Sequence, residues 1–266
     1  MLFLRIIFPV CLFLSGGLLF SPKQSGCQPG NSDSIRDFAA VFYPETKKTD
    51  QIIRHLAYAL CYEEKYEQAR WVAYRLTSAM VEKSAEERTD DFREDKEVPT
   101  GSASPDDYKK SGYDRGHLCP AGDMAWSERS MSESFYMSNM SPQAPKFNRG
   151  IWKTLESDVR DWAGRFDELY IVAGGVLKDS LETIGEDKVA VPKYFYKVIL
   201  DVKGPEKKAI AFVMPNEGSK NSVFDYAVTI DSVERLTDIN FFPALPDDLE
   251  NDLESHINVN LWQNFK

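Results

Sequence analysis

YDRGH (113–117), FYMSNMSPQ (135–143) and NRGIWKTLESDVRDWAGRF (148–166) are the three stretches of this sequence that decide the fold. If the first stretch is extended, Arg115 and His117 point to one side and Asp114 points to the other. In the third stretch, hydrophobic residues recur at helical spacing: Ile151, Trp152, Leu155, Val159 and Trp162. Asn148 stands where the N-cap of this helix belongs. The three stretches therefore predict an extended segment, a turn and a helix, in that order.

Patterns typical of β-strands flank these stretches on both sides. They are HLAYALCY (55–62), RWVAYRLT (70–77), ELYIVAGGVL (168–177), YFYKVILDV (194–202) and KKAIAFVMP (207–215). An amphipathic helix remains an alternative for the first of them, because short apolar runs are ambiguous. Residues 225–237 mix strand and helix signals, and PALPDDLENDLESH (243–256) predicts a helix near the C-terminus. We expect one α+β domain over residues 51–266, with a mostly antiparallel central sheet flanked by helices.

The N-terminal residues 1–27 predict a leader. Residues 1–20 form a long apolar run with Arg5 as their one charge, and a polar stretch follows. This pattern is typical of a signal peptide or a short membrane anchor. Ser25-Gly26-Cys27 is similar to the end of a lipoprotein cleavage box, which leaves lipid attachment at Cys27 open. We therefore expect an exported protein, periplasmic, secreted or attached to the envelope, in which residues 28–50 are a linker.

The charge of the chain argues against a broad nucleic-acid-binding surface. The formal net charge is −10, and removing residues 1–27 takes away Arg5 and Lys23 and no acidic residue, which leaves −12. Proteins that bind nucleic acid through a wide surface are usually basic. An enzyme that acts on nucleic acid needs only a locally positive cleft or a metal ion. The composition lowers the expectation of nucleic-acid binding without excluding it.

Two of the four cysteines, Cys61 and Cys119, lie in the body of the chain. There is no CxxC pair, so a structural zinc site of the usual spacing is not indicated. Export permits a disulfide, and a Cys61–Cys119 bond would brace the segment around His117. Two buried free thiols are the equally plausible alternative.

Arg115 and His117 are the first candidates for chemistry. Arg presents a fork of donors that matches phosphate oxygens, and neutral His accepts a proton near neutral pH. Gly116 between them keeps bulk away. Alone, this pattern is weak, because an isolated His is more often a structural residue than a catalyst.

Asn148 is a candidate metal ligand, since a side chain on the first turn of a helix is held rigidly and an amide oxygen suits Mg²⁺. The plain alternative is that Asn148 is only an N-cap, just as Asn139 could be only a turn residue. Glu156 lies eight residues after Asn148, about 12 Å along a regular helix. That separation favours a contact of Glu156 with a metal-bound water over direct ligation, and an exposed helix Glu is the alternative.

Together, DRGH, FYMSNMSPQ and FNRGIWKTLE closely resemble the DNA/RNA non-specific endonucleases, the ββα-metal nucleases of the Serratia nuclease and mitochondrial endonuclease G type. The spacing fits as well: 22 positions separate His117 from Asn139, nine more lead to Asn148 and eight more to Glu156. RWVAYRLT (70–77), DFRED (91–95) and IVAGGV (171–176) look like further family segments. The resemblance covers residues 50–245 and implies a ββα-metal motif at the active site.

The resemblance also implies roles for individual residues. His117 would be the general base that activates water, and Asn148 would be the direct protein ligand of one Mg²⁺ ion, with Mn²⁺ or another divalent ion as alternatives. Asn139 would orient the site, and Glu156 would hold a metal-bound water. Arg115 would contact phosphate, as would Arg93, for which a solvated loop position is an equal alternative.

The implied function is an exported, metal-dependent phosphodiesterase that cuts DNA and RNA internally without sequence preference. The alternative is a degenerate envelope module that binds nucleic acid or protein without cutting. The acidic charge favours this alternative, while the presence of His117, Asn139 and Asn148 disfavours it. Oligomeric state, preferred metal and preferred nucleic acid are not decided by the sequence.

Overall fold

The computed structural model describes residues 42–178 and 180–263. The predicted leader, residues 1–27, and most of the predicted linker lie outside the described residues. All described residues fall within one compact unit, Asn31–Lys266. No helix in the described part of the chain is long and apolar enough to cross a membrane.

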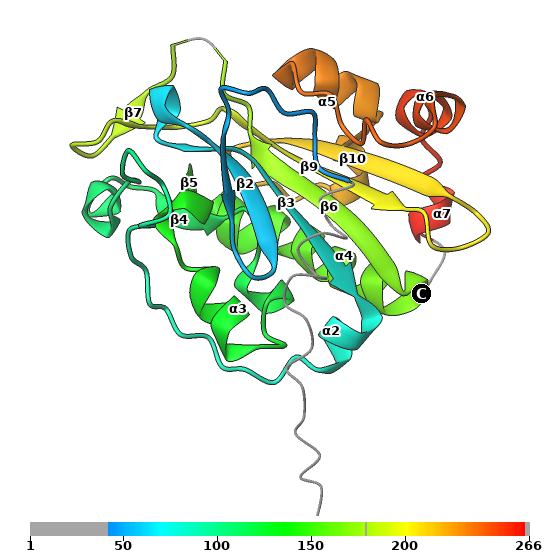
Figure 1. The fold of residues 1–266 in the computed structure, drawn as a ribbon, viewed down its shortest axis with the longest axis horizontal. Helices are drawn as coiled ribbons and strands as arrows, with labels where there is room; N and C mark the ends of the chain where they lie inside the picture. The colour runs from blue at the N-terminus through cyan, green and yellow to red at the C-terminus, as the bar shows by residue number, and fades with distance from the viewer. Residues whose placement is uncertain (1–41, 179, 264–266) are drawn as a thin grey trace, which may run out of the picture. The chain divides into compact units, whose positions relative to one another are not determined.

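A seven-stranded sheet forms the centre of this unit (Figure 1). Its order is β1-β2-β3-β6-β9-β10-β11, and every pair of neighbours is antiparallel. The strands are β1 (Gln51–Arg54), β2 (Tyr58–Glu63), β3 (Gln68–Thr77), β6 (Glu168–Gly175), β9 (Tyr194–Asp201), β10 (Lys208–Pro215) and β11 (Ala227–Val228). The predicted strands are confirmed, and the helical alternative for residues 55–62 is wrong. A short 3-10 turn, η1 (Glu64–Tyr66), joins β2 to β3.

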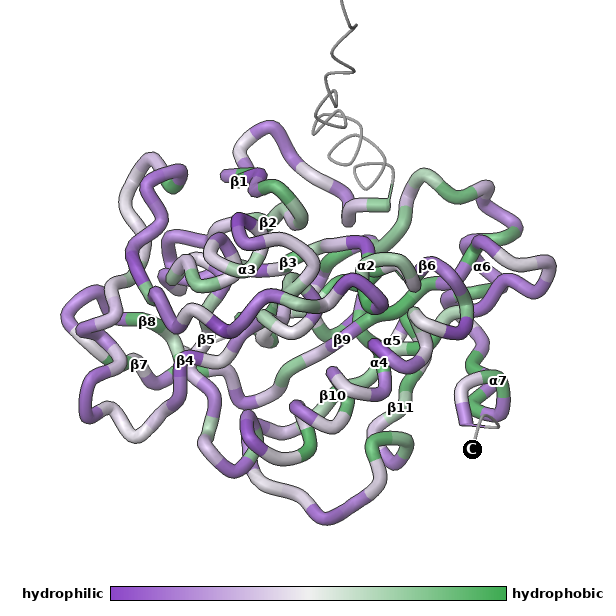
Figure 2. The backbone as a smooth tube through the Cα atoms, turned by 90° about the horizontal axis from the view of Figure 1, so that it is seen from below, coloured by the Kyte–Doolittle hydropathy of each residue, from purple (hydrophilic) through white to green (hydrophobic). Residues whose placement is uncertain are grey.

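The two faces of the sheet are covered by different helices. Residues 153–166 form α4 (Lys153–Phe166), which buries Leu155, Val159 and Trp162 against one face. The other face packs against α5 (Ile230–Thr237) and α6 (Asp247–Ser255) through Ile230 and Leu253. Figure 1 shows α4 on one side of the sheet and α5 and α6 on the other. In Figure 2 the hydrophobic stretches lie mainly in the interior, and the peripheral loops are largely hydrophilic.

Smaller elements connect the sheet and the helices. They are α2 (Ser78–Glu82), η2 (Pro105–Tyr108), β4 (Asp114–His117), η3 (Ala121–Asp123), α3 (Glu128–Glu133), η4 (Met137–Asn139), β5 (Met140–Gln143), η5 (Phe147–Trp152), β7 (Thr183–Ile184), β8 (Val189–Ala190), η6 (Val223–Tyr226) and α7 (Asn260–Gln263). β4 pairs with β5, and β7 pairs with β8, each in an antiparallel two-stranded sheet. The mixed signals of residues 225–237 resolve into β11 followed by α5, and the predicted C-terminal helix is α6.

The disulfide alternative for Cys61 and Cys119 is wrong, because both are buried free thiols. Successive side chains of β2 point to opposite faces of the sheet. Leu60 therefore packs on the α4 side, whereas Cys61 packs on the α5 side with Trp71. Cys119 belongs to the α4 side. A bond between the two sulfurs would have to pass through the sheet.

Candidate active site

The β4–β5 pair carries the DRGH segment into the interior. His117 lies opposite Met140, and Gly116 lies opposite Ser141. A Cβ atom on Gly116 would lie 2.2 Å from the side chain of Gln143. Only glycine leaves room for that side chain, so the residue between Arg115 and His117 is fixed by packing. With η5 and α4, this pair forms a β–β–α unit that lies on the α4 side of the central sheet.

The His117 ring is held edge-on between two phenylalanine rings. Its centroid lies 4.9 Å from that of Phe135 and 5.8 Å from that of Phe92. His117 is 8% exposed, and its buried Nε2 has no hydrogen-bond partner among the described residues. Burial lowers the pKa of His117 to about 3, and the positive charge of Arg88 lowers it further. The imidazole is therefore neutral at physiological pH and is able to accept a proton.

Arg115 and His117 lie on the same side of β4, as predicted, because both contact Phe92. The Arg115 guanidinium lies 4.9 Å from the centroid of that ring, and its Nη2 donates to the carbonyl oxygen of Pro105. The buried Nε of Arg115 has no partner in the described part of the chain. Arg115 therefore retains donor capacity for an anion next to His117.

Arg93 is engaged within the protein. Its guanidinium lies over the ring of Tyr136 at 4.0 Å and donates to Asp91 and to Ser132. These contacts tie the loop before η2 to α3 and half-bury the side chain. A contact of Arg93 with substrate stays a prediction.

Asn139 is fully buried and fastens the chain directly after His117. Its Oδ1 accepts from the Cys119 amide at 2.9 Å, and its Nδ2 donates to the carbonyl oxygens of Cys119 and Ser134 at 2.9 and 2.8 Å. Its own carbonyl oxygen accepts from Leu118 N at 3.0 Å. This set of bonds fits the orienting function that the resemblance implies, and it places Asn139 away from direct contact with solvent.

Asn148 is oriented by Asp114. The Asn148 Nδ2 donates to Asp114 Oδ2 at 3.0 Å, and Arg149 donates to both carboxylate oxygens of Asp114 at 2.8 and 2.6 Å. Burial alone would raise the pKa of Asp114, but the hydrogen bonds from Arg149 and Asn148 lower it below its usual value. Since Nδ2 is committed to this carboxylate, Asn148 Oδ1 points elsewhere, and it has no hydrogen bond from residues 42–178 or 180–263.

The prediction that Asn148 is the N-cap of a regular helix is wrong. Asn148 lies inside the wide turn η5, where its backbone N–H donates to Ala144 O, and Lys146 occupies the cap position without a side-chain cap bond. Gly150 has non-helical backbone angles, φ −108° and ψ −114°, and α4 begins only at Lys153. The kink means that a regular-helix rise does not describe the path from Asn148 to Glu156.

Glu156 belongs to a half-buried group of charges on the α4 side of the sheet. Burial raises its pKa to about 7, Lys197 opposes this rise, and Asp123 adds to it. Asp123 is bound by Arg160 Nη1 and by the Tyr74 hydroxyl, both at 2.8 Å. No hydrogen bond to the Glu156 carboxylate comes from the described residues, so this side chain is an acceptor without a donor. The exposed-helix alternative for Glu156 is therefore wrong.

Lys197 is the unexpected member of this group. It lies on β9, is fully buried, and its Nζ has no hydrogen-bond partner among the described residues. The ammonium lies 4.8 Å from the ring centroid of Trp152, whose Nε1 donates to His117 O at 3.4 Å. The apolar run YFYKVILDV hides this residue from sequence analysis, because one polar residue in a buried strand carries no local signal.

Arg88 was also missed by the sequence analysis. Its positive charge acts on both His117 and Glu156, and its guanidinium lies 4.7 Å from the centroid of Phe135. His117 and Glu156 therefore share one cation, although they are 39 positions apart in the sequence. A half-exposed Arg in a charged loop has no pattern that distinguishes it from its neighbours.

The other two histidines lie in ordinary structural positions. His55 is buried, and its Nε2 lies 2.9 Å from Asp95 Oδ2. His256 is exposed at the end of α6.

Asn148 and Glu156 each carry an oxygen that suits a hard divalent cation. Asn148 offers an amide oxygen and Glu156 a carboxylate, neither with a hydrogen-bond donor among the described residues, and hard cations prefer oxygen ligands. Arg149 neutralises Asp114 on one side, and Lys197 and Arg160 partly neutralise the acids on the other. These residues therefore carry less negative charge than a site built from several carboxylates. Such a site is typical of a cation that keeps most of its water ligands.

Comparison with known proteins shows that this chain is similar to nucleases. Residues 38–248 match the family model described as DNA/RNA non-specific endonuclease. The chain is 38% identical over 204 residues to "Nuclease EXOG, mitochondrial" of Danio rerio, covering 71% of this chain and 60% of that protein. It is 33% identical over 234 residues to "Nuclease C1" of Cunninghamella echinulata var. echinulata, covering 81% of this chain and 90% of that protein.

A chain in the structure described as "Crystal structure of the EndoG/EndoGI complex: Mechanism of EndoG inhibition" has the same fold. The TM-score is 0.73 at 29% identity, covering 82% of this chain and 94% of that chain. The matched region spans only about 60% of the length of the zebrafish relative.

Proposed function

Because the chain belongs to the DNA/RNA non-specific endonuclease family, we propose that it is a metal-dependent endonuclease that hydrolyses phosphodiester bonds in DNA and RNA. The observation that carries this proposal is the neutral His117, held between Phe92 and Phe135 beside the donors of Arg115. A neutral imidazole and a guanidinium on one strand face supply a proton acceptor and an anion ligand at one place.

His117 acts as the general base. It takes a proton from the attacking water as the water oxygen bonds to phosphorus, and the P–O3′ bond breaks on the opposite side. The products are a 5′-phosphate and a 3′-hydroxyl, whose oxygen takes a proton from solvent. General-base catalysis contributes about 10²–10⁴-fold. Arg115 and Arg88 supply further stabilisation of negative charge, because Arg115 shares the Phe92 contact with His117 and the charge of Arg88 acts on His117.

Asn148 and Glu156 are the residues that would hold the cation. Asn148 would bind it through Oδ1, because Asp114 already accepts the amide N–H. Glu156 would accept hydrogen bonds from metal-bound water, because its carboxylate has no competing donor among the described residues. The bound cation, Mg²⁺ in this proposal, supplies neutralisation of charge on the phosphoryl oxygens. Asn139 keeps the segment after His117 fixed through its bonds to Cys119.

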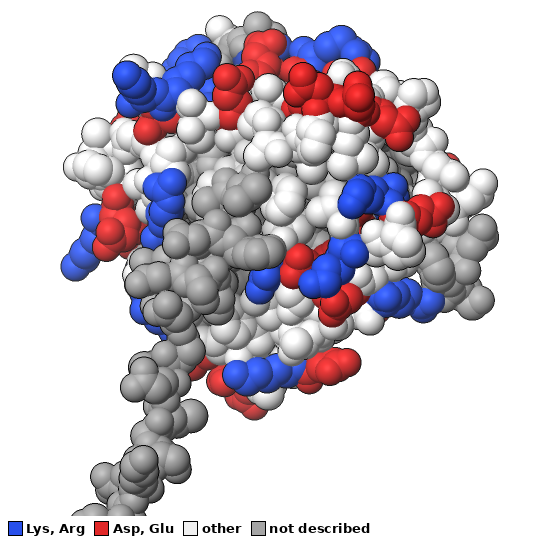
Figure 3. All heavy atoms as spheres, turned by 45° about the vertical axis from the view of Figure 1, so that its right-hand side comes forward, with Lys and Arg blue, Asp and Glu red and all other residues white. Residues whose placement is uncertain are grey.

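We expect no sequence preference, because the groups in this site contact phosphate rather than bases. Arg115, Arg88 and the cation address phosphate oxygens, which are the same at every nucleotide. Basic and acidic side chains are intermingled on the face drawn in Figure 3, and the net charge is −10. The enzyme thus relies on a local site for substrate binding. From the apolar run of residues 1–20 we further propose export to the periplasm, the envelope or the medium.

Plasmid DNA and single-stranded RNA cleavage tests this function. The full chain is incubated with Mg²⁺ or with EDTA, beside the His117→Ala variant. We expect cleavage of both substrates with Mg²⁺, none with EDTA, and a loss in His117→Ala of at least about 100-fold in kcat.

The matched control is His256→Ala, which removes an exposed histidine at the end of α6 and should cut at the wild-type rate. Wild-type cleavage by His117→Ala would remove His117 from the mechanism. Binding of DNA by the wild type without cleavage under Mg²⁺ or Mn²⁺ would support the non-catalytic binding module instead.

A further inference from the structure

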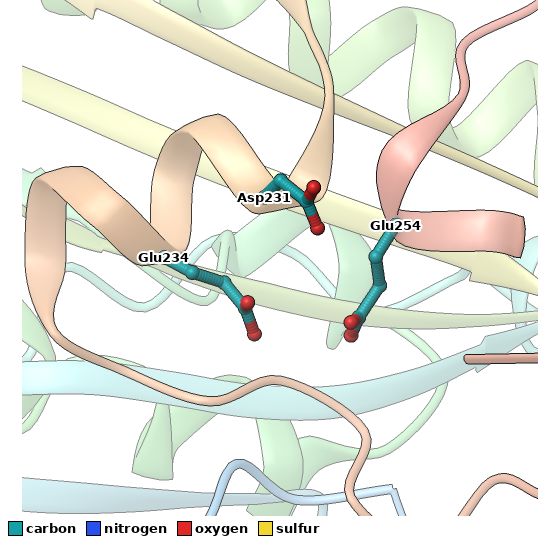
Figure 4. A group of neighbouring side chains, drawn as sticks. All are labelled: Asp231, Glu234 and Glu254. Atoms are coloured by element: carbon teal, nitrogen blue, oxygen red, sulfur yellow. The ribbon is translucent and has the colours of Figure 1, made fainter. Parts of the chain in front are cut away.

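Three carboxylates converge on the face of the sheet opposite the candidate active site. Asp231 and Glu234 come from α5, and Glu254 comes from α6. One carboxylate oxygen of each lies within 4.8 Å of the others. Figure 4 shows the three side chains pointing toward a common space between the two helices. Carboxylates at this separation repel one another unless a proton or a cation lies between them.

Glu254 is the member of this acidic triad whose burial is hardest to explain. It is 6% exposed, and its buried Oε1 has no hydrogen-bond partner in the described part of the chain. A buried carboxylate without a partner is costly. The Glu254 carboxylate points toward the space that it shares with Asp231 and Glu234, so the triad includes a buried carboxylate with an unsatisfied oxygen.

The surrounding groups offset only part of the charge. Glu250, also on α6, adds a fourth negative charge that acts on both Glu234 and Glu254. Arg235 lies 3.8 Å from Asp231 and also acts on Glu234. Glu234 Oε1 accepts one bond, from Phe241 N at 2.8 Å. Among the described residues, no cation pairs with Glu254, on which only the neighbouring acids act.

We propose that Asp231, Glu234 and Glu254 bind a Ca²⁺ ion that joins α5 to α6. Calcium takes six to eight oxygen ligands in flexible geometry, and carboxylates bind it through one or both oxygens. Magnesium usually takes only one or two carboxylates and keeps most of its waters. Three carboxylates, with Glu250 nearby, therefore select the larger ion, and water completes its shell on the exposed side.

The effect of the ion is structural. The elements it joins cover the α5 side of the sheet through Ile230, Val233 and Leu253, whereas the residues around His117 pack on the α4 side. An ion that binds only the folded chain stabilises it in proportion to the logarithm of its concentration. Calcium should therefore raise the unfolding temperature and hold α6 against α5. It should take no part in the cleavage step.

The experiment uses the full chain carrying Asn148→Ala, so that the candidate active-site ligand is removed. CaCl2 is titrated calorimetrically into this protein, and the unfolding temperature is recorded with Ca²⁺ and with EDTA. We expect one bound Ca²⁺ and a rise of several degrees. Adding Glu254→Gln should abolish both effects, and adding Asp252→Asn, an exposed change on the same helix, should preserve them.

Gln is isosteric with Glu254 and carries no charge, so the calcium-free Glu254→Gln variant should unfold at the wild-type temperature or above it. If it does not fold, Asp231→Asn on the other helix takes its place, with the same expected loss. Calcium binding that survives both changes would overturn the proposal. Absence of calcium binding in Asn148→Ala would overturn it too, and would show that a proton alone occupies the triad. Either result leaves the endonuclease proposal untouched, because cleavage is measured separately with Mg²⁺.

Discussion

The side-chain amide of Asn139 and the backbone of Cys119 form a reciprocal pair of hydrogen bonds, each 2.9 Å long. Asn139 precedes β5, and Cys119 follows β4 by two residues. The pair thus locks the exit of β4 against the entry of β5, directly beside His117. The side-chain amide suits this place, because its oxygen accepts from the Cys119 N–H while its two N–H groups donate to the carbonyl oxygens of Cys119 and Ser134.

Replacing Asn139 by Ala should therefore reduce both stability and catalysis. The change leaves the Cys119 N–H and the carbonyl oxygens of Cys119 and Ser134 buried without these partners. A loss of about 3 kcal/mol of unfolding free energy is expected, together with a larger fall in kcat than rise in KM. Urea unfolding and steady-state kinetics measure the two effects. The exposed Asn221→Ala is the control, and equal stability of the two variants would contradict this assignment.

Removing Asp114 should weaken the metal site without touching the proposed ligand. In Asp114→Ala the Asn148 amide loses the carboxylate that orients it. Partners of this kind typically contribute about 10–100-fold in metal affinity, so the Mg²⁺ concentration for half-maximal cleavage should rise by about that factor while activity returns at saturation. Arg149→Ala, which leaves the Asp114–Asn148 bond in place, should have a smaller effect. A kcat loss that Mg²⁺ does not restore would contradict the prediction.

Lys197→Met should move the acid limb of the pH–rate profile to higher pH. Burial raises the pKa of Glu156 to about 7, and the Lys197 ammonium opposes that rise. Without this charge the pKa of Glu156 rises further, so the ionised carboxylate that holds water is lost at a higher pH. The profile of kcat/KM at saturating Mg²⁺ measures the shift.

The control for Lys197 is Lys208→Met, a buried lysine on the neighbouring strand that pairs with Asp201 at 2.9 Å. It should lower stability, because it leaves Asp201 unpaired, and leave the acid limb where it is. An unchanged acid limb in Lys197→Met would show that the ammonium does not act on Glu156.

Glu254 should give the metal-free protein a stability that falls as pH rises. Its pKa is raised by burial, and further by Glu234, from 4.5 to about 8. The folded state then holds a proton that the unfolded chain has lost, so this contribution is complete below about pH 4.5 and disappears as pH rises through about 8. In EDTA, the unfolding temperature of Glu254→Gln should fall less steeply over this window than that of wild type. Asp252→Asn should follow the wild type, and parallel curves for all three proteins would contradict the prediction.

Reductant should not change the unfolding temperature of the protein. Cys61 and Cys119 are free and buried on opposite faces of the sheet. Burial raises the pKa of Cys61 to about 11 and raises that of Cys119 well above its usual value, so both thiols should react slowly with iodoacetamide in the native state. After unfolding without reductant, peptide mapping should find both alkylated. A Cys61–Cys119 linked peptide would contradict the structure.

Local sequence patterns were enough to predict the central sheet and the arrangement of the DRGH strand. Strand patterns such as RWVAYRLT and YFYKVILDV are local, because alternation and β-branched or aromatic content are properties of consecutive residues. The same local rule placed Arg115 and His117 on one side of β4 and Asp114 on the other. The spacing of hydrophobic residues predicted a regular helix with Asn148 as its N-cap, which is wrong, because the kink at Gly150 that produces η5 has no signature in that spacing.

The tertiary structure alone decided which groups share an environment. Cys61 and Cys119 lie on opposite faces of the sheet. Glu156 is surrounded by Lys197, Asp123 and Arg160. Glu254 is buried beside two other acids. The physical reason is that burial and charge interactions depend on side chains brought together from distant segments, and a protonation state follows from those neighbours rather than from the residue type. The sequence therefore named His117 as the candidate base, while only the fold made it a neutral one.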